Sequence, residues 1–241
     1  MEGLAIKQGA GKNWVVTHGD CVELMRAMPE RSVHLTVTSI PFASLYTYSA
    51  SDRDFGNCRS HDEFFDQYRF FAHELLRVTM AGRLAAIHCM TLPTSKARDG
   101  IIGLTDFPGA VIRAMQAEGW VYHSQTAIRK DPVSAMQRTK ALGLLHKTIR
   151  KDSSMSRTGI LDFLLAFRRE GQNPEPIAHD DSTFPVSKWQ QVAEPVWMDI
   201  DATQTLNGRS ARGDDDERHI CPLQTQVIER CIDLWSNPGD V

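Results

Sequence analysis

The chain has 241 residues, of which 41% are hydrophobic and 24% are charged, so its composition is that of a globular protein with a sizeable core. No apolar run approaches the roughly 18 residues of a membrane-spanning helix, so we expect no membrane span and no membrane partner. The N-terminus lacks the apolar region of a secretory signal, which favours a cytoplasmic protein. The 5 cysteines include no C-x-x-C pair, which excludes a disulfide framework and a zinc site and predicts no bound metal.

Strands and helices are expected to alternate along the chain. In order, we expect a strand at 13–18, a helix at 21–28, a strand at 33–38, a helix from His61 onward, a strand at 83–90, a helix at 107–120, a strand at 160–169 and a helix at 222–237. The segment 171–217 is rich in Pro, Asn, Asp and Ser and is expected to be extended or loop structure. The spacing predicts an α/β fold with a mostly parallel sheet and helices on both faces.

A basic segment stands out in a chain whose net charge is −3. Between residues 128 and 158 there are 8 Lys or Arg residues and 2 Asp residues. Such a segment is either a solvated helix face or a surface for phosphates. The charge distribution therefore leaves nucleic acid open as a partner, although the net charge argues against a protein coated for it.

The predicted strand at 33–38 runs directly into Ser39-Ile40-Pro41-Phe42. Ligands of open α/β sheets bind beyond the carboxyl ends of the strands. The Ser39 hydroxyl and the Ile40 carbonyl could together accept both hydrogens of an amino group, and Phe42 could offer its face to an aromatic ring. The alternative is an ordinary turn in which Phe42 is buried.

Several longer stretches around this tetrapeptide resemble a known family, the DNA amino-methyltransferases. The stretches are "HGDCVELMRAMPERSVHLTVTSIPF", "RVTMAGRLAAIHC" and "RHICPLQTQVIERCIDLWSNPGDV". The family's tetrapeptide is usually Asp/Asn/Ser-Pro-Pro-Tyr/Phe, and here Ile40 replaces the first proline. Other segments, such as "DPVSAMQRTKALGLLHKTIRKDSSMSR", are similar to bacteriophage DNA methylases. The resemblance covers nearly the whole chain and is closest to the circularly permuted members.

The resemblance implies a Rossmann-like methyltransferase fold and transfer of a methyl group from S-adenosylmethionine to adenine N6 or cytosine N4. The base of double-stranded DNA would be flipped out and stacked on Phe42, with Ser39, Ile40 and Pro41 completing the catalytic loop. Such an enzyme would work in the cytoplasm of a bacterial host cell. Cofactor contacts are implied for Asp20, His219, Pro222 and Gln224. Asp20 could instead cap the helix at 21–28, and His219 could serve in helix capping or a turn.

The same resemblance suggests three parts. Residues 1–127 would form the catalytic half, 128–158 a basic DNA-contacting and target-recognition insertion, and 159–241 the remaining strand, a loop segment and the helix that leads into the cofactor-binding part. The residues expected to contact DNA phosphates are all basic and comprise Arg129, Lys130, Arg138, Lys140, Lys147, Arg150 and Lys151.

The family's glycine-rich cofactor loop follows a Pro-Gly-Asp-x-Val-Leu stretch, and this sequence ends at Pro238-Gly239-Asp240-Val241. The C-terminal cofactor-loop strands are therefore expected to be missing, which would leave an exposed apolar gap or a rearranged sheet. Three explanations stay open: a truncated or split methyltransferase whose site is completed by a homodimer partner or a complementing chain, a fragment of an active enzyme, or an inactive DNA-binding remnant.

Overall fold

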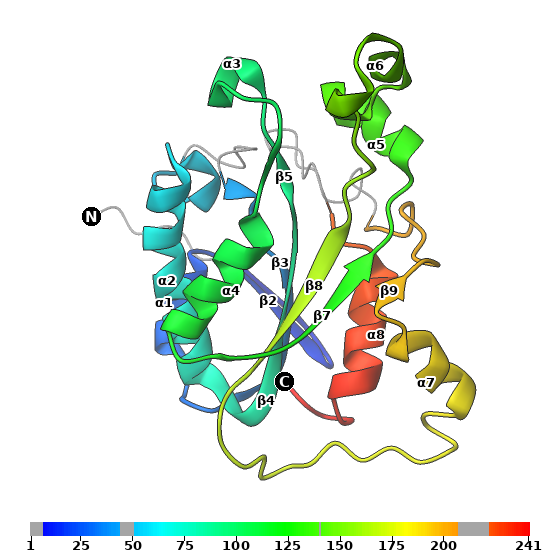
Figure 1. The fold of residues 1–241 in the computed structure, drawn as a ribbon. Coiled ribbons are helices and arrows are strands. Elements are labelled where there is room, and N and C mark those ends of the chain that lie inside the picture. The colour runs from blue at the N-terminus through cyan, green and yellow to red at the C-terminus, as the bar shows by residue number, and fades with distance from the viewer. Residues whose placement is uncertain (1–6, 44–50, 140, 207–221) are drawn as a thin grey trace.

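The computed structural model of the protein describes residues 7–43, 51–139, 141–206 and 222–241. Within these ranges, five strands form the main sheet, in the order β3-β4-β8-β7-β9 (Figure 1). They are β3 (Val33–Ser39), β4 (Thr79–Met90), β7 (Val121–Ile128), β8 (Asp162–Arg168) and β9 (Val196–Trp197). Two short antiparallel pairs lie outside it, β1 (Lys7–Gly11) with β2 (Trp14–His18) and β5 (Leu92–Pro93) with β6 (Leu104–Thr105).

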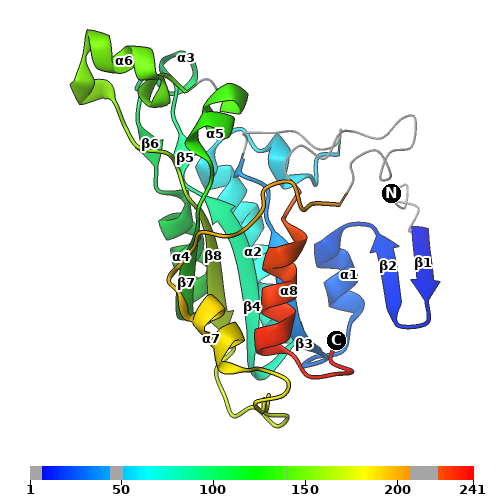
Figure 2. The same cartoon turned by 90° about the vertical axis from the view of Figure 1, so that its right-hand side faces the viewer.

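Helices cover both faces of the main sheet, as predicted (Figures 1 and 2). They are α1 (Cys21–Ala27), α2 (His61–Val78), α3 (Lys96–Asp99), α4 (Phe107–Ala117), α5 (Pro132–Thr139), α6 (His146–Lys151), α7 (Val186–Ala193) and α8 (Thr225–Trp235). On one face, α2 and α4 bury an aromatic cluster that includes Phe64, Tyr68 and Phe107. On the other face, Val227 and Cys231 of α8 pack into a smaller apolar cluster. No helix in the described part of the chain is both long enough and apolar enough to span a membrane.

The main sheet is mixed, but four of its five strands, β3, β4, β7 and β9, run in the same direction, so the expectation of a mostly parallel sheet is confirmed. β3 and β4 are parallel, as are β7 and β9, but β8 runs antiparallel to both β4 and β7. β8 is reversed because the connection through α5 and α6 brings the chain back between β4 and β7 in the opposite direction.

Segment 171–217 differs from its prediction as loop or extended structure, because it contains α7 and β9.

The predicted strand at 13–18 exists as β2, but it forms a hairpin with β1 that stands apart from the main sheet (Figure 2). Its apolar residues face solvent: Trp14 is 57% exposed, Val15 63% and Val16 62%. The hairpin therefore presents an apolar surface to solvent.

β3 is an edge strand of the main sheet, and residue 241 lies against its edge. The backbone N–H groups of His34 and Leu35 donate to the carbonyl oxygen of Val241, at 2.6 and 3.2 Å. The Val241 N–H donates to Nδ1 of His34, at 3.1 Å. The neighbouring Asp240 is bound by the buried Arg83, whose Nη2 lies 2.7 Å from Oδ2 of Asp240. The segment after α8 thus occupies the start of the β3 edge.

Candidate active site

The tetrapeptide Ser39-Ile40-Pro41-Phe42, predicted to be catalytic, lies at the carboxyl end of β3, as the sequence predicted. Ser39 is the last residue of that strand, and Ile40 and Pro41 follow it directly. All three line a cavity of about 630 Å³, together with Asp20 at the start of α1 and Arg53. A cavity of this size lies within the range of about 300–1,000 Å³ that holds small ligands. The structure therefore brings three of the four predicted catalytic residues and the first predicted cofactor residue to one site.

Phe42 does not offer the exposed ring that the sequence suggested. It is 3% exposed and belongs to the main apolar cluster, with its ring centroid 6.1 Å from that of His88. The chain after Pro41 turns inward, and burial of a phenylalanine ring is favourable. The aromatic residues that line the cavity are instead Phe55, Phe70 and Phe71.

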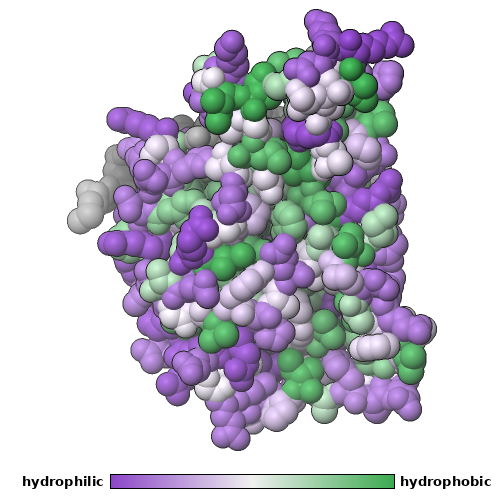
Figure 3. All heavy atoms as spheres, in the orientation of Figure 1, coloured by the Kyte–Doolittle hydropathy of each residue, from purple (hydrophilic) through white to green (hydrophobic). Residues whose placement is uncertain are grey.

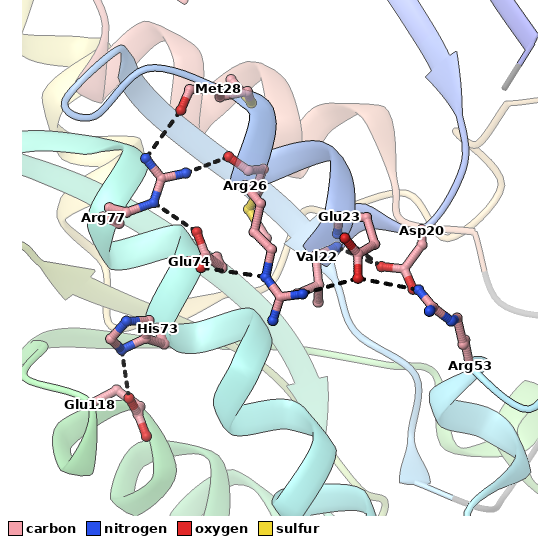
Figure 4. Close-up of polar contacts among 11 residues, drawn as sticks. Asp20, Val22, Glu23, Arg26, Met28, Arg53, His73, Glu74, Arg77 and Glu118 are labelled. Carbon is pink, nitrogen blue, oxygen red and sulfur yellow. Dashed lines mark hydrogen bonds and ion pairs between the residues drawn. The ribbon is translucent and has the colours of Figure 1, made fainter. Parts of the chain in front are cut away.

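Asp20 is the N-cap of α1 and also binds an arginine that the sequence analysis did not single out. Its Oδ1 accepts from the backbone N–H groups of Val22 and Glu23, at 2.9 and 3.1 Å. Its Oδ2 lies 3.0 Å from Nη1 of Arg53 (Figure 4). Burial raises the pKa of Asp20, but the N-cap bonds and Arg53 outweigh it and hold that pKa below 3.8. Asp20 is thus a carboxylate with one fixed oxygen and one oxygen in an exchangeable ion pair.

The helix that carries Asp20 is fastened to α2. The Arg77 guanidinium donates to the carbonyl oxygens of Met25 and Met28 at the end of α1, and to Glu74 on its own helix (Figure 4). Arg26 lies 3.7 Å from Glu74 and 3.0 Å from Glu23. These contacts fix α1, and with it Asp20, relative to the sheet.

Two of the other predicted cofactor residues, Pro222 and Gln224, do not line this cavity. His219 lies outside the described residues. Gln224 is the N-cap residue of α8 and pairs with Thr205 in an isolated bridge. Contact of these residues with a cofactor stays a prediction.

Most of the basic segment forms α5 and α6, which follow the carboxyl end of β7 (Figure 1). Arg129, Lys147, Arg150 and Lys151 are exposed there. Lys140 lies outside the described residues, and Arg138 lies on α5 with its side chain outside the described part of the structure. The tip formed by α6 also exposes Leu142 and Ile149, so hydrophilic and hydrophobic side chains mix on this surface (Figure 3).

Lys130, which was predicted to contact a DNA phosphate, forms an ion pair with a buried carboxylate within the protein. Its Nζ lies 2.6 Å from Oδ2 of Asp162, which is 2% exposed. The same oxygen lies 3.1 Å from Nε2 of His88, and Nδ1 of His88 lies 2.9 Å from Oγ of Ser39. Sequence reasoning missed His88 and Asp162, although a signal existed: each is a polar residue in an otherwise apolar strand, where burial demands a partner.

A group of metal-ligand type lies away from the cavity, at the β3 edge. One ligand atom each of His34, Glu175 and Asp240 lies within 4.8 Å of the others. Nδ1 of His34 already accepts the Val241 N–H, and Asp240 is paired with Arg83. These groups are used in holding the last residues against β3.

Solved structures place this architecture in a known class. The chain is 19% identical to a protein of Thermus thermophilus that is assigned as a DNA modification methylase and was solved in complex with S-adenosyl-L-methionine, with a TM-score of 0.64 over 92% of this chain and 74% of that chain. It is 15% identical to PvuII DNA methyltransferase, described as cytosine-N4-specific, with a TM-score of 0.58 over 92% of this chain and 70% of that chain. The protein therefore has the Rossmann-like α/β methyltransferase fold.

The sequence itself gives the family. A model of the DNA methylase family, N6_N4_Mtase, matches residues 33–241, from the start of β3 onward. No curated protein sequence matches the chain. The chain belongs to the DNA methylase family, and its fold and the position of Ser39-Ile40-Pro41 agree with that membership.

Proposed function

We propose that this chain is a DNA methyltransferase that uses S-adenosylmethionine to methylate an exocyclic amine, adenine N6 or cytosine N4, in double-stranded DNA. The observation that carries the proposal is the shared cavity of Ser39, Ile40, Pro41 and Asp20 in a member of the DNA methylase family. The solved neighbour with bound S-adenosyl-L-methionine supports the choice of cofactor.

The cavity fits a nucleoside-sized cofactor in volume and in chemistry. Asp20 offers a carboxylate oxygen to hydroxyl or amino groups, in exchange for Arg53, and Phe71 adds an apolar wall. When bound, S-adenosylmethionine supplies an electrophilic methyl group. The protein's part is to hold the amine in line with that group, since positioning alone can lower a barrier by about 7–11 kcal/mol.

Ser39 is the residue in this cavity that can orient the amine. Its hydroxyl oxygen can accept one amine hydrogen, which directs the nitrogen lone pair and disperses the positive charge that develops on nitrogen. The backbone carbonyl of Ile40 is the second expected acceptor. Pro41 limits the backbone conformations of the loop, so both acceptors keep their relative positions.

The test is calorimetric titration of the full chain with S-adenosylmethionine, followed by transfer of a labelled methyl group to duplex DNA. We expect cofactor binding, methylated DNA, and a loss of at least about 10-fold in kcat for Ser39→Ala, the size of one good hydrogen bond. Asp20→Asn should weaken cofactor binding, while Asp106→Asn, at the N-cap of α4 and outside the cavity lining, serves as a matched carboxylate control. DNA binding without any cofactor binding would instead support a DNA-binding chain or one half of a split enzyme that is completed by a second copy or another chain.

The exposed cations of α6 are expected to bind DNA phosphates. The triple variant Lys147→Gln, Arg150→Gln, Lys151→Gln should weaken DNA binding, and the slope of log K against log salt should fall by about 0.9 for each phosphate that the protein no longer neutralises. Fluorescence anisotropy with a labelled duplex at several salt concentrations measures both quantities. Arg69→Gln with Arg113→Gln removes exposed charge from α2 and α4 and should leave the slope unchanged; equal effects of both variants would contradict a specific role for α6.

A further inference from the structure

A chain of buried polar side chains lies directly behind Ser39. In the parallel pairing of β3 with β4, Ser39 is the register partner of His88, and Asp162 starts the neighbouring strand β8. Oγ of Ser39 lies 2.9 Å from Nδ1 of His88, and Nε2 of His88 lies 3.1 Å from Oδ2 of Asp162. His88 is 4% exposed and Asp162 is 2% exposed. Three strands thus carry a continuous Ser-His-Asp chain that ends at the cavity.

The positions of the protons in this Ser-His-Asp series follow from the charge of Asp162 at the end away from the cavity. Burial raises the pKa of Asp162, but the His88 hydrogen bond and the Lys130 ammonium outweigh it and hold that pKa below 3.8. The ionised carboxylate can only accept, so Nε2 of His88 must carry the proton that it donates to Oδ2. In the neutral imidazole, Nδ1 then has a free lone pair, and the Ser39 hydroxyl donates to it. The lone pairs of Ser39 Oγ are left for a substrate.

We propose that His88 and Asp162 are positioning residues that fix the Ser39 hydroxyl as a hydrogen-bond acceptor for the amino group of the target base. This inference rests on the proposed methyltransferase function and deepens it. A serine hydroxyl without such a partner can rotate and point its O–H at the amine. In that orientation the hydroxyl does not accept an amine hydrogen, and the productive orientation of the base is disfavoured. Lys130 neutralises the buried carboxylate of Asp162. Its side chain is one-third exposed, so it lies between Asp162 and solvent.

The first test needs no catalysis. Nitrogen NMR of the histidine side chains in the full-length protein, with His88 assigned from its loss in His88→Asn, reports which ring nitrogen carries the proton. We expect the Nε2–H form at neutral pH. An Nδ1–H form would overturn the proposal, because His88 would then donate to Ser39.

The second test separates positioning from packing. His88→Ala should lower kcat by about 10- to 100-fold, the range of a good to strong hydrogen bond, with the KM for DNA nearly unchanged. In His88→Asn an amide oxygen can stand in for Nδ1 as acceptor, so this variant should keep most of kcat. Equal losses of kcat in folded His88→Ala and folded His88→Asn would overturn the proposal.

The two tests also distinguish this inference from the proposed function. An inactive wild-type chain with the Nε2–H form would contradict the proposed function while supporting the orientation of Ser39. An active wild-type chain with the Nδ1–H form would do the reverse. If His88→Ala does not fold, His88→Asn and the NMR result still decide.

Discussion

Asp240→Ala is expected to lower the free energy of unfolding by about 3–5 kcal/mol, the usual cost of removing one partner from a buried ion pair. Arg83 is 1% exposed, and its Nη2 lies 2.7 Å from Oδ2 of Asp240. Its Nε and Nη1 have no hydrogen-bond partner among the described residues. The variant would therefore leave a buried guanidinium without its counter-charge. It would also remove the acceptor of the Asn237 N–H, which lies 2.8 Å from the same oxygen.

Chemical denaturation of the wild type and the variant measures this difference. The matched control is the double variant Arg83→Met with Asp240→Ala, in which both charges are absent and an unbranched apolar side chain fills the space. Replacing both members of a buried pair is often close to neutral, so most of the lost stability should return. A double variant as unstable as Asp240→Ala would show that the cost arises from the loop after α8 instead of from the stranded charge.

Asp162→Asn is expected to cost about 2–4 kcal/mol at neutral pH, toward the lower end for a buried pair because Lys130 can turn to solvent. The pKa of Asp162 in the folded protein lies below its ordinary value of 3.8. The carboxylate therefore stabilises the fold at pH values above 3.8, and this contribution disappears as the pH falls through the lower pKa of the folded state. The wild type and the variant should differ fully at pH 7 and converge in acid.

Thermal or urea unfolding across that pH range checks the sign as well as the size of the effect. Lys130→Met with Asp162→Asn is the matched control, since it removes the ammonium together with the carboxylate. A stability gap between the wild type and Asp162→Asn that persists unchanged in acid would mean that Asp162 contributes through packing and not through its charge.

The long amphipathic helices were predictable from the sequence, whereas α3 and α7 were not predicted. The long helix from His61 and the helix that starts near Phe107 were evident because their apolar residues recur at helical spacing and end up in the core. β7 was missed because it alternates exposed and half-buried residues and carries His123, Ser124 and Gln125, which do not mark a strand. The direction of β8 could not be predicted either, since a sequence does not show into which slot a long insertion returns its strand.

The candidate site was predictable in its catalytic loop and not in its surroundings. Ser39 and Pro41 follow a clear strand, and this placement is confirmed. The inward turn of Phe42 and the pairing of Lys130 with Asp162 depend on contacts between segments far apart in the sequence, for example 74 residues between His88 and Asp162. Asp20 was expected either to contact a cofactor or to cap a helix. In the structure it caps α1 and also lines the cavity.

The pairing of β3 with Val241 also affects how this protein is made. The bond between His34 and Val241 spans 207 residues of sequence, so few contacts in the molecule are less local. At a synthesis rate of about 5–20 residues per second, the ribosome needs roughly 10–40 s to deliver the second partner after the first. During that interval the hydrogen-bonding edge at the start of β3, at His34 and Leu35, is open to other strands. The same edge is therefore the point at which a nascent chain is most exposed to mispairing, and where a chaperone would protect it best.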